Sequence, residues 1–250
     1  MKKVLIVLAV VFLCPVLRAQ QLYNMSLDKW SRQGLTWNPY PKDARDWQRT
    51  WDSVNRGLMI LGINTMVPEF EHLAVPGPGK AAAKIVSRNI AWGFLTGNLF
   101  TGRFVRVVRL SGIEMYCGTP FRGRPKSLSG YYHYMPGVIN FASEPYNALK
   151  GKTDSGFIEI SLYSWPEALH IITNDMPPHD PKEDPCLVGM GVLRITEATD
   201  GYIHFELPIE YVSDATPSFV GINVLSSALG QFFTGSSRTV LYLDELRFDY

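Results

Sequence analysis

The chain has 250 residues, 46% of them hydrophobic, and its 24 Lys and Arg against 23 Asp and Glu give a formal net charge of +1 at pH 7. Three of the basic residues, Lys2, Lys3 and Arg18, lie in an N-terminal leader, so the remainder carries two more acidic than basic residues. Because no basic excess is left, the composition excludes a nucleic acid or an anionic membrane surface as the partner.

The first 19 residues have the features of a signal peptide. Two lysines precede an apolar run over 4–17, and Arg18, Ala19 and Gln20 follow it. The run is too short to span a bilayer, and the small Ala19 suits a cleavage site. We therefore expect cleavage after Ala19 and export to the periplasm, the cell surface or the medium. Residues 20–250 contain no second apolar stretch of spanning length and are predicted to form one domain without a membrane span.

One helix is predicted in the mature chain, over 42–55. Pro41 stands at its start, Gly57 lies just past its end, and Trp47 and Trp51 fall on one face. The same segment is also consistent with an ordered loop that its tryptophans pack.

Short strands separated by turn signals make up most of the chain. The run 157–163 alternates, with aliphatic side chains on one face and Glu159, Ser161 and their aromatic neighbours Phe157 and Tyr163 on the other. The acidic, proline-rich segment 174–185 is predicted to be an exposed loop. Many short strands without helical periods between them indicate an all-β sandwich or barrel with few short helices. The expected strands cover 58–61, 71–75, 82–88, 104–113, 130–135, 157–163, 188–195, 202–207, 219–225 and 239–248.

The last twelve residues predict a half-buried strand with an unusual charge. Val240, Tyr242, Leu246, Phe248 and Tyr250 alternate onto one face, and Asp244 shares that face. A buried carboxylate has to be hydrogen-bonded, paired with a cation or bound to a metal.

Calcium is the metal that suits Asp244, because it takes carboxylate and backbone oxygens. Asp28, in the first strand, is the candidate second ligand, and such a site would join the two ends of the chain. The alternative is an Asp244 carboxylate that accepts hydrogen bonds from backbone N–H groups or from an arginine.

Two cysteines remain after the leader, Cys117 and Cys186. In an oxidising compartment they form one disulfide across a long loop, or they stay separate as two small buried side chains. Their spacing leaves both alternatives open.

No catalytic residues can be assigned. The Gly-x-Ser-x-Gly and His-Glu-x-x-His motifs are absent. Glu69 and Glu71 would project from one face of a strand, but a glycosidase usually places its two acids across a cleft, on different strands. A solvated edge strand is the simpler interpretation of this pair.

Aromatic residues are the strongest indication of a ligand. Sugar rings pack their C–H faces on aromatic faces, while their hydroxyls bind polar groups around the rim. The alternative is that most of these rings fill the core of the sandwich. The candidate ligand-binding residues are Trp37, Tyr40, Trp47, Trp51 and Tyr132.

Several blocks of the sequence, taken in order, resemble the putative carbohydrate metabolism domain family. The blocks span nearly the whole mature chain and cover 24–30, 37–40, 79–84, 97–102, 130–137 and 241–246. The resemblance implies a two-sheet antiparallel β-sandwich of the jelly-roll type, similar to carbohydrate-binding modules of bacteria that degrade complex glycans. Asp244 matches the position at which the closing strand of calcium-bearing jelly rolls often supplies a ligand.

We therefore expect an exported jelly-roll module that binds a poly- or oligosaccharide without cleaving it. Two alternatives remain: a glycan-active enzyme whose carboxylates converge only in the fold, and a cell-surface module that binds other proteins.

Overall fold

The structure is a computed structural model that describes residues 19–90, 93–108, 112–173 and 179–250, apart from the side chain of Ile60. The expected signal peptide lies outside these residues except for Ala19, and residues 174–178 of the expected loop lie outside them as well. Within the described segments, no helix is both long enough and apolar enough to cross a bilayer.

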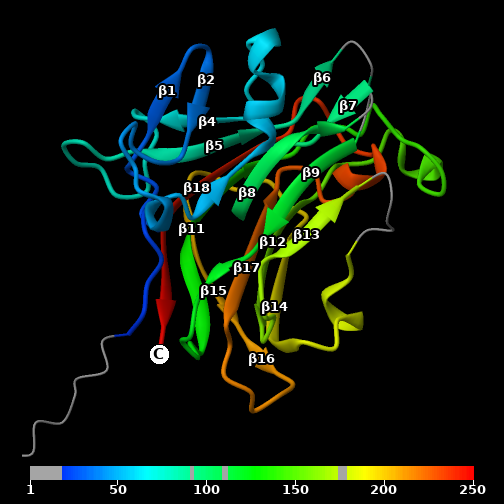
Figure 1. Ribbon diagram of the computed structural model, residues 1–250. Helices are drawn as coiled ribbons and strands as arrows, with labels where there is room; N and C mark the ends of the chain where they lie inside the picture. The colour runs from blue at the N-terminus through cyan, green and yellow to red at the C-terminus, as the bar shows by residue number, and fades with distance from the viewer. Residues whose placement is uncertain (1–18, 91–92, 109–111, 174–178) are drawn as a thin grey trace, which may run out of the picture.

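Two antiparallel sheets pack against each other (Figure 1). The larger sheet has nine strands in the order β13-β9-β8-β17-β12-β14-β16, with β10 paired to β17 and β3 paired to β8. The smaller sheet has five strands in the order β15-β11-β18-β5-β4. The prediction of an all-β, two-sheet antiparallel sandwich is confirmed.

The strands of the nine-stranded sheet are β3 (Trp51–Asp52), β8 (Asn98–Val108), β9 (Gly112–Cys117), β10 (Thr119–Pro120), β12 (Gly156–Tyr163), β13 (Leu169–Ile172), β14 (Leu187–Ile195), β16 (Glu210–Tyr211) and β17 (Phe219–Leu225). Those of the five-stranded sheet are β4 (Met66–Glu69), β5 (Ala82–Val86), β11 (Ser127–Met135), β15 (Ile203–Pro208) and β18 (Val240–Asp249). Two hairpins are separate, β1 (Ser31–Gln33) with β2 (Thr36–Asn38) and β6 (Arg88–Ile90) with β7 (Gly93–Leu95). The 3-10 helices are η1 (Asp46–Gln48), η2 (Val54–Leu61), η3 (Asn147–Leu149), η4 (Pro181–Glu183) and η5 (Gly230–Phe232).

The main core lies between the two sheets. Ile158, Ile160 and Leu162 of β12 project into it from one side, and Leu241 and Leu243 of β18 from the other. All five side chains are completely buried. The alternation predicted for 157–163 is therefore correct, and every second residue of β12 faces outward.

The helical segment lies later in the chain than predicted. The segment 42–55 holds the short η1, the strand β3 and the first two residues of η2, and η2 is the longer helix, which includes the expected strand 58–61. The Ser53 side chain caps η2 by accepting a hydrogen bond from Asn55 N–H at 3.2 Å. Gly62 ends the helix with a φ of 65°. These two end signals, rather than Pro41 and Gly57, fix the bounds of the helix.

The expected strand 71–75 is a turn instead. The Glu69 carboxylate, at the end of β4, accepts hydrogen bonds from the N–H groups of Phe70 and Glu71 at 3.0 Å each. These donors are satisfied by a side chain and do not enter a sheet ladder. The prediction that Glu69 and Glu71 project from one face of a strand is therefore wrong.

A β-bulge changes which face of the sheet the side chains of β18 project from. Tyr131 of β11 opposes Asp244, whereas Ser129 opposes Arg247, so β18 carries one extra residue between these pairs. Glu245 takes up the extra residue with a φ of 47°. The predicted common face is therefore wrong: the core-facing residues are Leu241 and Leu243 before the bulge and Leu246 and Phe248 after it. Asp244 lies on the outer side of the sheet with Tyr131.

Cys117 and Cys186 are free thiols, which decides against the disulfide. The Cys117 thiol donates to the sulfur of Met115 at 3.3 Å, and burial raises its pKa to about 12.

Candidate functional site

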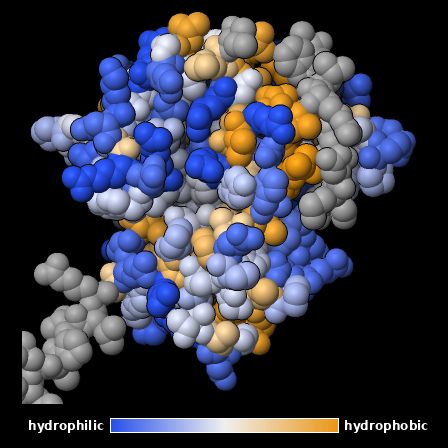
Figure 2. Space-filling model, in the orientation of Figure 1, coloured by the Kyte–Doolittle hydropathy of each residue, from blue (hydrophilic) through white to orange (hydrophobic). Residues whose placement is uncertain are grey.

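The outer face of the nine-stranded sheet has a covered part and an open part. η2 packs on β8, where Val54 and Leu58 meet Phe100 and Phe104 in a second, small core. In the orientation of Figure 1, exposed apolar side chains gather in the upper part of the surface, in the region of η2 and β8 (Figure 2). The helix covers the sheet over β8. On the outer face of β17, β12 and β14, which we call the open face, Glu159 and Asn223 are half-buried. Tyr163 is buried there, and the ring of His179 lies 5.9 Å from its ring.

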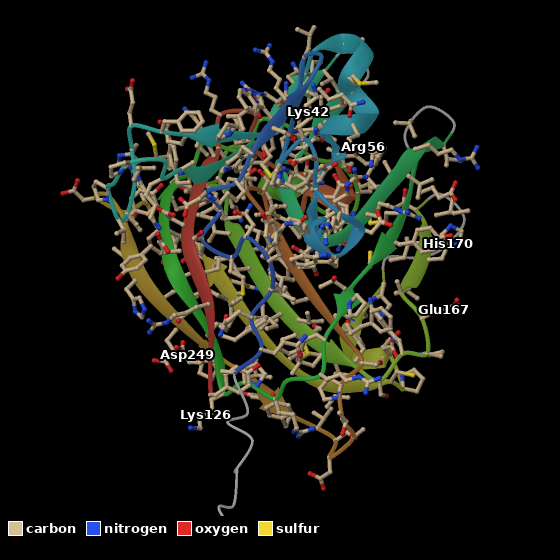
Figure 3. The ribbon with its side chains drawn as sticks, turned by 60° about the vertical axis from the view of Figure 1, so that its left-hand side comes forward. Lys42, Arg56, Lys126, Glu167, His170 and Asp249 are labelled. Carbon is tan, nitrogen blue, oxygen red and sulfur yellow. The ribbon has the colours of Figure 1, made fainter. Side chains whose placement is uncertain are left out.

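The strand β12 lies at the centre of this open face. Its alternation turns Glu159 outward, directly opposite Asn223 of β17 and Val192 of β14. Opposed side chains in a sheet have Cβ atoms about 4.5–5.5 Å apart, so a carboxyl and an amide lie side by side here. In Figure 3, β12 and β17 cross the middle of the molecule, between His170 of β13 and Asp249 of β18.

Two residues further along β12, the layer of outer side chains has a gap. Ser161 opposes Gly221 of β17 and Met190 of β14. A Cβ placed on Gly221 would make only ordinary contacts, at 3.5 Å from Tyr163 Cε2 and 3.8 Å from the Ser161 carbonyl oxygen. Ser161 Oγ is buried and has no hydrogen-bond partner among the described residues. A buried hydroxyl without a partner is a place for a bound water, and because Ser161 is 1% exposed, a ligand on this face would reach it through such a water.

Glu159 is close to its titration point at neutral pH. Burial raises the pKa of Glu159 to about 7, and the negative charge of Asp180 adds to the increase. The positive charge of Arg194 opposes it. Near neutral pH the carboxyl group is therefore available both as a hydrogen-bond donor and as an acceptor.

A wall of stacked aromatic rings closes one end of the open face. The rings of Tyr163 and Trp165 lie parallel, with centroids 3.7 Å apart and planes 9° apart. Trp165 Nε1 donates to Asp184 Oδ2 at 2.9 Å, and His179 Nε2 lies at the same distance from that oxygen. Both stacked rings are almost completely buried, so they shape the site rather than offering a free stacking surface.

A cavity of about 420 Å³ extends the open face toward the sheet edge at β16. Lys182, Asp184 and Glu210 line it with charged groups, and Met190 forms part of its apolar lining. Met190 opposes Ser161 of β12, so the cavity lies beside β12, although no residue of β12 lines it.

This surface combines hydrogen-bonding groups with aliphatic side chains, and a sugar ring needs both, because it carries hydroxyls at its edge and C–H groups on its faces. A carboxyl, a hydroxyl and an amide provide both donors and acceptors within one strand spacing of each other. Val192 and Met190 add aliphatic surface beside them. The arrangement suits binding of a sugar through its hydroxyls and C–H groups.

Two of the five aromatic residues predicted to bind a ligand belong to the main core. Trp51 is completely buried, and its Nε1 donates to the Tyr23 carbonyl oxygen at 3.0 Å. Tyr132 is 9% exposed and packs on Phe205, with ring centroids 6.0 Å apart. Neither ring is available to a ligand, because each faces the inside of the sandwich, and their assignment to the site is corrected.

The other three aromatic residues lie at the N-terminal side of the fold, away from β12. Trp37 is half-buried in β2, and Tyr40 is buried under the guanidinium of Arg49, 5.5 Å from its ring centroid. Trp47 is 64% exposed and meets the ring of Tyr23 edge-on. None of the ring contacts observed in the described segments joins two of the five predicted residues.

The two predicted calcium ligands have separate partners. Asp28 Oδ2 lies 3.1 Å from Lys80 Nζ, and Asp28 Oδ1 accepts a hydrogen bond from Ala81 N–H at 3.0 Å. Asp244 Oδ2 accepts one from Ala74 N–H at 2.9 Å, and burial raises the Asp244 pKa to about 6. Within the described ranges, no three His, Cys, Asp or Glu side chains gather as metal ligands would. The contacts satisfy both carboxylates without an ion, and the calcium site stays a prediction.

The polar residues of the open face were not singled out from the sequence. The alternation of 157–163 did place Glu159 and Ser161 on the face opposite the core. The sequence did hold one signal for this site. The second face of 157–163 carries a single carboxylate between aromatic residues, whereas a strand that faces solvent would carry several charges. Asn223 and Gly221 gave no such signal, because their position opposite β12 depends on the strand order.

Comparison with known proteins agrees with the fold. A search of curated protein sequences found no match. A solved structure of a "putative glycoside hydrolase" from Bacteroides thetaiotaomicron superposes with a TM-score of 0.66 at 21% identity, over 92% of this chain and 71% of that chain. A second "putative glycoside hydrolase", from Bacteroides vulgatus, gives a TM-score of 0.64 at 19% identity, over 88% of this chain and 94% of that chain. At these identities the likeness establishes a shared fold.

The sequence itself identifies the family. Residues 26–248 match the family model described as "Putative carbohydrate metabolism domain". The match covers most of the 250-residue chain, as the resemblance of the ordered sequence blocks implied. The chain therefore belongs to the putative carbohydrate metabolism domain family.

Proposed function

We propose that this protein is an exported carbohydrate-binding domain that does not cleave its ligand, and that it holds a poly- or oligosaccharide on the outer face of β17, β12 and β14. The observation that carries the proposal is the grouping of Glu159, Ser161 and Asn223 around the gap over Gly221. Membership of a carbohydrate-related family supports the ligand class, and the leader over 1–19 supports export.

The chemistry of the face fits a saccharide better than a charged metabolite. Glu159 and Arg194 leave it without a large charge of one sign, and the Ser161 hydroxyl needs a partner. Neutral hydroxyls satisfy such a mixture of donors and acceptors, whereas a phosphate or a carboxylate would need unpaired cations.

The test fills the gap in the face. Gly221→Phe would project a ring over Ser161, while Gly221→Ala is the matched control, because its Cβ makes only ordinary contacts. Affinity electrophoresis and calorimetry against soluble β-glucan, xylan, xyloglucan, mannan and galactan measure binding. We expect Gly221→Phe to weaken binding at this face by at least about tenfold and Gly221→Ala to bind as the unchanged protein does. Equal binding by both variants would show that the ligand lies elsewhere.

A glycan-active enzyme is the second candidate, and the charge state of Glu159 favours it. A carboxylic acid that titrates at a pKa of about 7 suits a general acid at neutral pH. Reducing-sugar release from a bound polysaccharide, lost in Glu159→Gln while binding persists, would establish catalysis and contradict the non-catalytic function.

A further inference from the structure

The opposite side of the sandwich carries a second hollow, at the β-bulge of β18. Gly130 of β11 lies beside the bulge, where an added Cβ would come within 2.8 Å of Leu246 Cδ2. A glycine at this position lets Leu246 turn into the core. On the outer side, a cavity of about 430 Å³ lies over the bulge, lined in part by Tyr131, His204 and Arg247.

Fixed charged groups form one side of this cavity. Lys80 Nζ lies 2.6 Å from Glu245 Oε1 and 3.1 Å from Asp28 Oδ2. Two of the three ammonium hydrogens are used in these contacts, so one donor remains. The second carboxylate oxygen of Glu245 remains as an acceptor beside it. These groups are held in place before a ligand arrives, which lowers the entropic cost of binding.

The other side combines an aromatic ring with a second cation. Tyr131 is half-exposed on the outer face, and His204 meets its ring edge-on, with centroids 5.2 Å apart. Arg247 Nε lies 2.9 Å from Asp249 Oδ1 and donates to Ser129 Oγ at 3.1 Å. The Tyr131 ring provides the flat apolar surface on which the C–H face of a sugar packs.

The charges indicate an uncharged ligand. Lys80 lies against two carboxylates, Asp28 and Glu245, and Arg247 pairs with Asp249, so the carboxylates outnumber the cations by one. No cation is left in excess for a carboxylate or phosphate, while paired donors and acceptors remain for vicinal hydroxyls. The volume lies within the range of small-molecule sites, about 300–1,000 Å³.

We propose that this cavity, which we call the bulge site, is a second binding site for a neutral saccharide. Its ligand class rests on the proposed function, but its location does not, because it lies on the other sheet. The two sites face away from each other, so one short oligosaccharide cannot reach both. The protein would then bind two glycan chains at once, with the gain in avidity that two linked sites give.

Calorimetric stoichiometry tests the proposal. The ligand is a short oligosaccharide of whichever neutral polysaccharide binds, with polygalacturonate as a charged comparator. We expect two molecules per unchanged protein, one for Tyr131→Ala, one for Gly221→Phe and none for the double variant. Tyr131→Phe keeps the ring and should retain two, whereas Tyr131→Ala weakens the bulge site by about tenfold or more. Thermal unfolding of each variant confirms that it is folded.

The possible outcomes separate the two proposals. A stoichiometry of one that Gly221→Phe abolishes overturns the bulge site and leaves the proposed function intact. A stoichiometry of one that only Tyr131→Ala abolishes supports the bulge site and contradicts the face over β12. Stronger binding of polygalacturonate that Tyr131→Ala removes overturns the assignment to neutral sugars. Absence of binding to all the polysaccharides overturns both proposals.

Discussion

At the scale of single residues, three carboxylates lie in three different environments within the β-sandwich. Asp28 is paired with the ammonium of Lys80, and Asp244 accepts a backbone hydrogen bond from Ala74. Glu159 faces outward between strands, and burial raises its pKa to about 7. Burial raises the pKa of Asp244 as well, to about 6, but Asp244 accepts the Ala74 hydrogen bond, whereas Glu159 faces the proposed ligand site.

The raised pKa of Glu159 has a stability cost at neutral pH. The folded protein holds this proton more tightly than the unfolded chain does, so the favourable contribution is present at low pH and is lost as pH rises through about 7. We expect Glu159→Gln to be more stable than the unchanged protein by up to about 2–3 kcal/mol at pH 8, and to differ little near pH 5. Urea unfolding at both pH values measures the difference.

A matched variant removes a carboxylate that is already paired. Asp28→Asn loses its contact with Lys80 and is expected to be less stable at both pH values. If Glu159→Gln showed the same pH dependence as the unchanged protein, the shifted titration would not belong to Glu159.

At the scale of elements, the alternation of every second residue predicted strands correctly, whereas the residues expected to begin and end the helix did not predict its bounds. The expected strands at 157–163 and 219–225 coincide with β12 and β17, because a strand with one face in the core repeats every two residues. The predicted strand 104–113 is divided, with β8 ending at Val108 and β9 beginning at Gly112. The bulge in β18 could not be predicted, because Asp244 and Leu246 are two residues apart in the sequence whichever face their side chains take. Only the pairing of β18 with β11 shows the extra residue.

A pair of histidines holds the turn after β4 on the outer face of the five-stranded sheet. His72 Nε2 lies 2.6 Å from His133 Nδ1 of β11, and the Tyr202 hydroxyl donates to the His72 carbonyl oxygen at 3.0 Å. Tyr242 stacks on the His133 ring at 5.4 Å. A hydrogen bond between two imidazoles needs one ring nitrogen without a proton, so it is lost when both rings are charged.

Acid is therefore expected to loosen this turn. Burial lowers the pKa of His133, and a charge on His72 lowers it further, while Asp200 acts in the opposite direction. A histidine with a lowered pKa stabilises the folded state above its unfolded pKa of about 6.5, and this contribution is lost as pH falls below that value. Amide exchange at Ala74, corrected for its intrinsic pH dependence, should accelerate between about pH 7.5 and 5.5.

The variant His72→Asn provides the control. Asp244, which accepts from Ala74 N–H, titrates in the same range, because burial raises its pKa to about 6. The variant keeps Asp244 and should lose most of the acceleration. If exchange in the variant responded to pH as before, Asp244 alone would account for the effect.

At the scale of the whole molecule, the N-terminal segment and the last strand lie side by side. The Gln21 amide exchanges two hydrogen bonds with the backbone of Phe248, both at 2.8 Å, and Lys80 links Asp28 to Glu245. A calcium ion between Asp28 and Asp244 was expected to join the chain ends; the ammonium of Lys80 joins Asp28 to Glu245, the neighbour of Asp244, instead.

This arrangement predicts how metal and mutation affect stability. The melting temperature should be equal with calcium and with a chelator, because Lys80 supplies the positive charge. Lys80→Met should lower the melting temperature, since it leaves Asp28 and Glu245 facing each other unpaired. A rise with calcium in the unchanged protein would contradict the ammonium bridge and support the metal site.

Export is predicted by the leader alone. Expression of the full chain in a bacterial host and N-terminal sequencing of the product should give Gln20 as the first residue. Recovery of the product in the cytoplasm with its leader attached would contradict export.

Much of the fold could be predicted from the sequence, and little of the candidate site. The core face of β12 follows from local alternation, and six ordered blocks indicated the family. The grouping of Glu159 with Asn223 depends on β12 pairing with β17, some 60 residues away in sequence, which no local pattern encodes. The aromatic residues were assigned wrongly because their sequence neighbours do not reveal burial: Trp51 occurs among polar residues and Tyr132 among other aromatic rings, yet both fill the core.

The outer face of β17, β12 and β14 is the proposed binding face for a saccharide. The most direct measurement is an NMR titration of the isotope-labelled protein with an oligosaccharide of the polysaccharide that binds. We expect the side-chain amide of Asn223 and the backbone amides over 157–163 and 219–225 to shift most within the nine-stranded sheet. Unchanged signals there, with shifts confined to Trp37 and Trp47, would contradict it.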